Sequence, residues 1–162
     1  MCEVKILLDN AITSYNVSSD LALITLEKIQ NNISVISEIF SSLAKENINV
    51  DMITHTPSYT GIVTVSFSIL STDLAKSILA LAKFRSDIPK LKMDVDANNA
   101  KITIYGEGKK NVPEIAGNLF STLTNDGIDI KLVTTSETGI SYLVSGRDEL
   151  KAIDTIRREF NL

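Results

Sequence analysis

The stretch VSSDLALITL, residues 17–26, returns as VDANNAKITI at residues 95–104. Within these stretches Ile24 and Ile102 lie 78 positions apart. Further apolar residues recur 80 positions on, pairing Phe40 with Phe120, Leu43 with Leu123, Ile48 with Ile128, and Ile53 with Val133. An internal repeat of this length sets the architecture before any residue is given a chemical role. We therefore expect two similar modules within the 162 residues.

Each copy alternates strand and helix signals, which are apolar residues at a period of two or at helical spacing. In the first copy they predict strands at 21–26, 49–56, 63–69 and 91–95, and helices at about 33–46 and from 74 onward. In the second copy they predict strands at 101–105, 129–136 and 140–145, and helices at about 113–126 and 147–160. The first order is βαββαβ, the ferredoxin-like plan of an α+β fold. The second is βαββα and lacks its closing strand.

The missing strand has a candidate at the beginning of the chain, because a long unpaired sheet edge is a liability. Residues 12–17 stand before strand 21–26 as residues 90–95 stand before strand 101–105. We infer that they complete the second sheet, so that the first module is inserted into the second. The modules would then be residues 21–97 and residues 12–18 plus 98–162. Residues 3–8 are an alternative for the same strand.

Composition excludes several classes of protein. The hydrophobic fraction of 44% is enough for a packed core, and the net charge of −4 comes with no basic cluster larger than a pair. A nucleic-acid or membrane-surface partner is therefore not expected. No signal peptide or uninterrupted apolar span is visible, and one cysteine cannot form an internal disulfide. We expect a cytoplasmic protein.

No residue constellation indicates catalysis. His55 is the only histidine, and we find no nucleophile, acid–base pair or phosphate-binding loop, so neither a metal site nor a cofactor is expected. The strand-to-helix connections, residues 27–34 and 106–114, are the best ligand candidates, because helix N-termini present free N–H groups that suit a carboxylate. The alternative is a plain capped connection. The hydroxyls at 54–56 and 134–136 could likewise bind a ligand or simply close a turn.

Several segments resemble the paired ACT domains of aspartate kinases. INVDMI, residues 48–53, is similar to a segment of their first ACT domain, and GIDIKLVTTSE, residues 127–137, followed by Ile140–Ser141, is similar to their second. The C-terminal stretch 150–162 is also similar to the end of that family. The resemblance covers about residues 12–162, and it implies the same insertion of one module into the other.

The resemblance implies a regulatory unit that binds an amino acid effector, lysine or threonine, and controls a separate kinase domain or subunit. It implies a homodimer with effector sites at domain interfaces, and no enzyme activity in this chain by itself. The implied effector contacts are Asn31, Ser34, Asn49, Asp51 and His55 in the first module, and Val112, Pro113, Glu114, Ile115, Asp129, Ser136 and Glu137 in the second.

The ligand loops depart from the family pattern. Asn31 stands where the family has an aspartate that can pair with an effector's ammonium, and Ser34 stands where it has a glycine. Glu114 replaces the glycine of the second loop and would repel an effector's carboxylate. The alternative reading is therefore an ACT-fold dimerisation or interaction module that has lost effector binding.

Overall fold

The computed structural model describes residues 12–30, 32–56, 61–106, 112–160 and 162, without the side chains of residues 112–114. The chain divides into two compact units. The first unit is Asp20–Ala97, and the second unit joins the N-terminal segment ending at Ser19 to Asn98–Leu162. Residues 3–8, the alternative for the closing strand, lie outside the described residues.

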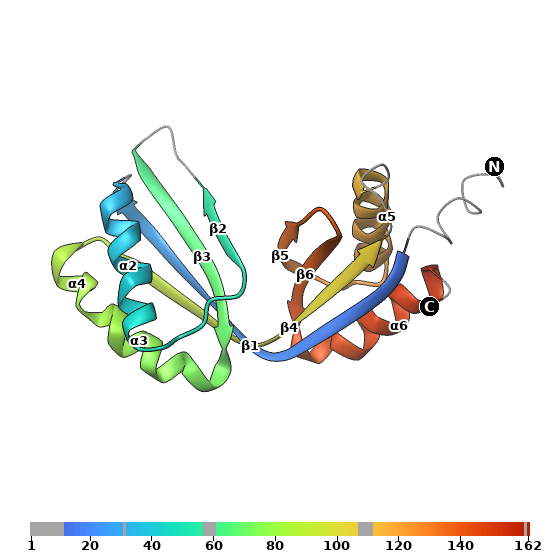
Figure 1. The fold of residues 1–162 in the computed structure, drawn as a ribbon, viewed down its shortest axis with the longest axis horizontal. Coiled ribbons are helices and arrows are strands. Elements are labelled where there is room, and N and C mark those ends of the chain that lie inside the picture. Colours follow the sequence, from blue (N-terminus) through green and yellow to red (C-terminus); the bar gives the residue numbers. More distant parts are fainter. Residues whose placement is uncertain (1–11, 31, 57–60, 107–111, 161) are drawn as a thin grey trace. The chain divides into compact units, whose positions relative to one another are not determined.

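The first unit has the expected order of elements (Figure 1). It contains the second part of β1 (Ile12–Gln30), α2 (Ile33–Lys45), β2 (Ile53–Thr56), β3 (Ile62–Leu70), a 3-10 turn at Ser71–Asp73, α3 (Leu74–Ala82), α4 (Phe84–Asp87) and the first part of β4 (Lys92–Gly106). Its strand order is β2-β3-β1-β4. The βαββαβ order and this sheet order together make it ferredoxin-like.

The second unit repeats the plan. It contains the first part of β1, the second part of β4, α5 (Val112–Asn125), β5 (Ile130–Thr135), β6 (Gly139–Ser145), a 3-10 turn at Gly146–Asp148 and α6 (Glu149–Phe160). Its strand order is β1-β4-β6-β5. Ile12 is 5% exposed and belongs to the core of this unit, and Tyr15 and Val17 pack against that core. The N-terminal part of β1 therefore stands where the closing strand of the second copy is missing.

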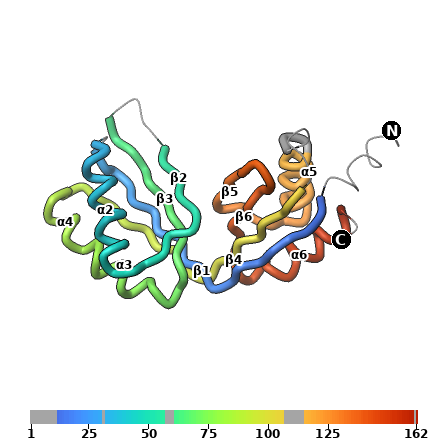
Figure 2. The backbone as a smooth tube through the Cα atoms, viewed as in Figure 1, coloured from blue at the N-terminus to red at the C-terminus, as the bar shows by residue number. Residues whose placement is uncertain are grey.

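Both β1 and β4 are longer than the sequence patterns predict, because each contributes residues to both units (Figure 2). The expected strands 12–17 and 21–26 are parts of β1, and the expected strands 91–95 and 101–105 are parts of β4. Asp20 and Asn98 mark the passage from one unit to the other, and both have left-handed backbone, with φ of 57° and 62°. Asp and Asn tolerate this region better than most residues other than Gly.

Equivalent contacts recur in the two cores. Phe40 of α2 meets Phe67 of β3 edge to face, with ring centroids 5.5 Å apart. Phe120 of α5 meets Tyr142 of β6 in the same way at 5.6 Å. In each unit the helices and the alternate strand residues enclose one apolar cluster. The repeated apolar positions of the sequence are therefore the repeated core.

A lysine secures the end of the first helix in both units. Lys76 of α3 donates to the Glu46 carbonyl at the end of α2, and Lys151 of α6 donates to the Asp126 carbonyl at the end of α5. A cation at a helix C-terminus satisfies an orphan carbonyl and complements the helix dipole. The left-handed Asn47 and Gly127 follow these carbonyls, with φ of 53° and 70°. Asn47 thus ends α2 as its residue type predicts.

Replacing Ile12 by Ala tests whether the N-terminal strand completes the second unit. Ile12 is almost fully buried among residues that follow Asn98, so the truncation should lower the free energy of unfolding by about 2–4 kcal/mol. Chemical denaturation followed by circular dichroism measures it. Ile33, which is 76% exposed, provides the control, and Ile33→Ala should change stability by less than about 0.5 kcal/mol. Equal effects of the two substitutions would contradict the strand assignment.

Asp126 should make stability depend on acid pH. Its carboxylate accepts hydrogen bonds from Thr155 Oγ1 at 2.5 Å and Arg158 Nη2 at 2.6 Å, and these hold its pKa below the ordinary 3.8. A pKa lowered by folding stabilises the folded state above the unfolded value, and this contribution is lost as pH falls through the folded value. We expect wild type to melt above Asp126→Asn at neutral pH, with the gap closing below pH 3.8. A gap that widens on acidification would contradict this assignment.

Candidate functional site

The connection between β1 and α2 is shorter than the sequence predicts. Residues 27–30, expected in a loop, continue β1, because Ile29 and Gln30 pair with Val63 and Ile62 of β3. A β-bulge makes this extension fit: two residues, Glu27 and Lys28, stand between partners that are separated by a single residue in β3. Lys28 adopts a left-handed backbone conformation in this bulge, with φ of 62°, and this accommodates the additional residue.

Asn32 caps helix α2. Its side-chain oxygen accepts a hydrogen bond from the Ser34 N–H at 3.0 Å, and so satisfies one of the orphan donors of the first turn. The capped-connection alternative therefore describes this end of the helix. Ser34 itself is exposed, and Asn31 lies outside the described residues.

The strand that should carry three more site residues is shorter than predicted. β2 begins at Ile53, so Asn49 and Asp51 precede it, while His55 lies exposed within it. The segment before β2 still follows β3, because the Asp51 N–H donates to the Ser68 carbonyl at 3.0 Å and the Met52 N–H to Ser68 Oγ at 3.0 Å. The Ser68 hydroxyl thus replaces a backbone carbonyl as the partner of the Met52 N–H, and the regular strand pairing starts at the next residue, Ile53.

The sheet register separates these residues within the first unit. Asp51 bonds to Ser68, whereas Gln30, just before the β1–α2 connection, pairs with Ile62. Six positions along an antiparallel strand correspond to about 20 Å. His55 pairs with Val65 and lies between the two levels. A single amino acid cannot contact Ser34 and Asp51 of the same unit at once.

The second unit separates its predicted residues in the same way. Gly106 N donates to the Thr138 carbonyl at 3.1 Å, so the end of β4 and the turn with Ser136 and Glu137 lie at one end of the sheet. Exposed Asp129 precedes β5. Val112, Pro113 and Glu114 form the first turn of α5, but their side chains are outside the described part.

Two predicted contacts of the second unit serve the fold. Ile115 is 6% exposed and belongs to the hydrophobic core. Ser136 Oγ accepts from the N–H groups of Gly139 at 3.1 Å and Thr138 at 3.3 Å, and thereby closes the β5–β6 turn. The turn-closing alternative therefore describes Ser136. Near these residues there is a cavity of about 10 Å³, which is room for about one water molecule.

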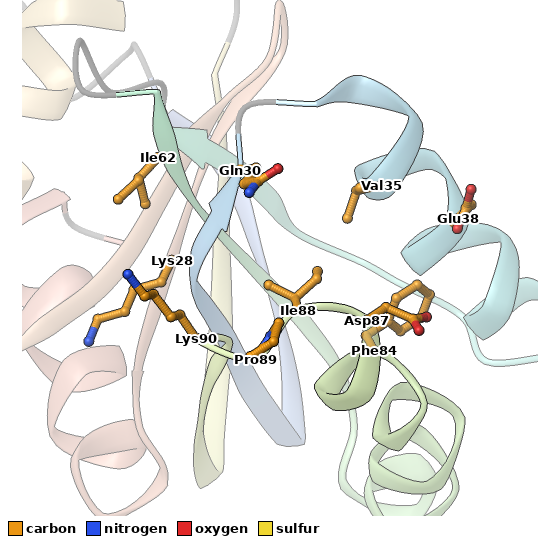
Figure 3. Close-up of a pocket in the computed structure, with 10 residues that line it drawn as sticks. All are labelled: Lys28, Gln30, Val35, Glu38, Ile62, Phe84, Asp87, Ile88, Pro89 and Lys90. Carbon is orange, nitrogen blue, oxygen red and sulfur yellow. The ribbon is translucent and has the colours of Figure 1, made fainter.

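The first unit contains a much larger cavity, which the sequence patterns did not reveal. Its volume is about 450 Å³, within the range of small-molecule pockets (Figure 3). None of the predicted effector residues that the structure describes is among its lining residues. The lining comes from the ends of β1 and β3, from α2, and from the segment around α4, namely Lys28, Gln30, Val35, Glu38, Ile62, Phe84, Asp87, Ile88, Pro89 and Lys90. One feature of the sequence bears on this cavity. Pro89 follows the second predicted helix of the first module, and the cavity lies where that helix divides into α3 and α4.

The described residues contain no group of three or more His, Cys, Asp or Glu side chains that could hold a metal ion. Burial raises the pKa of Tyr142, so its phenol stays protonated at neutral pH. In the same described part, no helix is long and apolar enough to cross a membrane.

Solved structures match the chain over almost its full length. The regulatory subunit of aspartate kinase from Thermus thermophilus, in a ligand-free form, matches with a TM-score of 0.84 and 24% identity, over 93% of this chain and 99% of that one. A structure of aspartokinase alpha and beta subunits matches with a TM-score of 0.85 and 26% identity, over 94% of this chain and 100% of the matched chain. The fold is therefore that of these aspartate kinase subunits.

Curated relatives match in part of their length. Aspartokinase 2 of Bacillus subtilis (strain 168) is 33% identical over 141 residues, which cover 86% of this chain and 34% of the relative. An aspartokinase of Helicobacter pylori (strain ATCC 700392 / 26695) is 32% identical over 87% of this chain and 34% of its own. The chain thus spans about a third of the length of these relatives.

A family model described as ACT domain matches the chain twice, at residues 27–83 and 102–160. The two matches fall one in each unit and contain the repeated helices and strands. They correspond to the two similar modules that the internal repeat predicts. The fold resembles that of a regulatory subunit of aspartate kinase, and the chain belongs to the ACT domain family.

Proposed function

We propose that this chain is the effector-sensing part of an aspartate kinase system, in which a free amino acid, lysine or threonine, adjusts the activity of a kinase domain or subunit. The main support is the match to aspartate kinase regulatory subunits over more than nine tenths of the chain. The ACT modules of this proposal are residues 21–97 and residues 12–18 plus 98–162. An effector that binds one arrangement of the modules better shifts the equilibrium by its difference in affinity.

The effector site of this proposal lies between two modules of different chains. Asp51 and Gln30, which precedes Ser34 by four residues, are about 20 Å apart along the strand direction of one unit, by the register argument above. An effector that uses both kinds of contact must take the strand-to-helix connection from one module and the segment before the edge strand from another. A second copy of the chain supplies that module, so the proposal includes a homodimer.

Within this proposal the contacts in the first module are Asn31, Ser34, Asn49, Asp51 and His55. In the second module they are Val112, Pro113, Glu114, Asp129 and Glu137. Ile115 and Ser136 would act indirectly, because Ile115 packs in the core and Ser136 holds the β5–β6 turn. The exposed positions of Ser34, Asn49, Asp51 and His55 are what such contacts require.

A second candidate function is an ACT-fold dimerisation module without a small-molecule effector. One observation favours it: Asn32 already occupies the Ser34 N–H, a donor that an effector carboxylate would otherwise use. Under this alternative the dimer forms, but its stability is independent of free amino acids.

Substitution of Ser34 tests the effector site. Titration calorimetry of the wild-type chain with lysine and with threonine should show saturable heat for one of them. Ser34→Ala should weaken that binding about three- to tenfold, as expected for the loss of one hydrogen bond. Ser37→Ala is the matched control, because Ser37 is an exposed serine one turn further along α2, and its affinity should equal that of wild type.

Three measurements distinguish the two candidate functions: sedimentation for the oligomeric state, calorimetry for the heat of binding, and the melting temperature with and without amino acids. A dimer whose melting temperature rises with the bound amino acid supports the effector proposal, since a ligand at 100 times its Kd adds about 2.7 kcal/mol to the stability. A dimer that gives no heat and no change in melting temperature with any proteinogenic amino acid supports the dimerisation module instead. A chain that stays monomeric with and without amino acids contradicts both.

A further inference from the structure

The 450 Å³ cavity of the first unit combines an apolar floor with charged ends. Phe84 is buried in the core of this unit, and Val35 and Ile88 pack against that core, so the floor is apolar and continuous with the core. Pro89 closes the same wall. A pocket lined mainly by apolar groups with a few converging charged groups is the usual form of a small-molecule site.

The charges separate by sign. In Figure 3 the lysines, Lys28 and Lys90, lie on one side of the pocket, and the carboxylates of Glu38 and Asp87 lie on the other, with the apolar residues between them. Within the part of the chain that the structure describes, none of these four side chains has an ion-pair partner. Two neighbouring unpaired cations repel each other, and an anion placed beside them relieves that repulsion.

Lys28 occupies a position at which lysine is conformationally unfavourable. It sits in the β-bulge of β1 with φ of 62°, a left-handed region that is unfavourable for residues other than glycine. The equivalent position of the second module, 78 residues on, is Gly106. Bulges commonly redirect a side chain next to a functional site, and backbone strain gathers at such sites. The lysine side chain at this bulge therefore points to a role in binding.

We propose that this cavity is a binding site for a small molecule that carries a carboxylate and an ammonium at opposite ends of an apolar chain, an ω-amino carboxylate. The carboxylate binds between Lys28 and Lys90, the hydrocarbon lies over Val35, Phe84 and Ile88, and the ammonium reaches Glu38 and Asp87. All of its described lining residues belong to the first unit, so the proposed site needs no second copy of the chain. Its described lining contains none of the effector residues proposed above.

The test is a titration of the isotope-labelled full chain, followed through its backbone amide resonances. 6-Aminohexanoate is the probe, and hexanoate and hexylamine are its single-charge analogues. We expect saturable shifts at residues 28, 35, 88 and 90, with a Kd for 6-aminohexanoate about tenfold lower than for either analogue, because each analogue loses one charge-assisted contact. Absence of saturation at these amides, or equal affinity for probe and analogues, overturns the proposal.

Variants assign each end of the ligand. Lys28→Gly removes the cation and relieves the left-handed backbone, so it should fold at least as well as wild type, as the amide spectrum reports directly. It should raise the Kd for 6-aminohexanoate about tenfold while leaving the Kd for hexylamine unchanged. Glu38→Gln together with Asp87→Asn should do the reverse, weakening hexylamine but not hexanoate.

Two controls separate this site from the effector site. Lys45→Gln removes an exposed lysine of α2 that does not line the cavity, and it should leave the Kd for 6-aminohexanoate unchanged. Ser34→Ala should also leave it unchanged, even where it weakens lysine or threonine binding. A Kd that changes equally in Lys45→Gln and Lys28→Gly indicates a general charge effect and overturns the proposal.

Discussion

Two long strands govern this structure, because β1 and β4 each give residues to both hydrophobic cores. Ile12 and Val17 of β1 pack in the second core, while Ala22, Ile24 and Leu26 of the same strand are buried in the first. The second core therefore depends on a segment that precedes it by about eighty residues in the chain. A break in either strand removes packing from both units, which makes the modules difficult to separate.

The two modules keep the same means of stabilisation and differ where the first strand leads into the first helix. Facing hydroxyls, Thr25 with Ser66 at 3.0 Å and Thr103 with Ser141 at 2.9 Å, repeat on the strands, as do the lysine-capped helix ends. The bulge at the end of β1 breaks this similarity, since Lys28 stands where the second module has Gly106. Positions that hold the core stay alike because close packing tolerates little change. Exposed loop positions have more freedom, and function can differ there.

The register of the sheet limits what one module can bind. Within a unit, β3 or β6 holds the edge strand in fixed pairing, so the residues before the edge strand stay far from the strand-to-helix connection. In the effector site that we propose, the contacts are shared between modules, and effector binding would then be coupled to association. The cavity beside α4 differs in kind, because the lining residues that the structure describes all belong to one unit. A ligand bound there would contact α2 through Val35 and Glu38, and α4 through Phe84 and Asp87.

The repeat, the order of elements and the helix limits follow from local rules that a single chain displays. The helix expected at about 33–46 runs from Ile33 to Lys45, because its apolar spacing, its Asn32 cap and the left-handed Asn47 are all local. The joining of short predicted strands into β1 and β4 depends on hydrogen-bond partners remote in the sequence, which periodicity does not encode.

The surroundings of the predicted site residues also depend on partners remote in the sequence. His55 and Ser34 are exposed, as their residue types suggest. Ile115, however, packs in the hydrophobic core, and the Ser136 hydroxyl accepts a hydrogen bond within the β5–β6 turn. The charged cavity was decided by tertiary structure alone, because Lys28, Glu38 and Lys90 come together only when the bulge, α2 and the turn at Pro89 pack around Phe84.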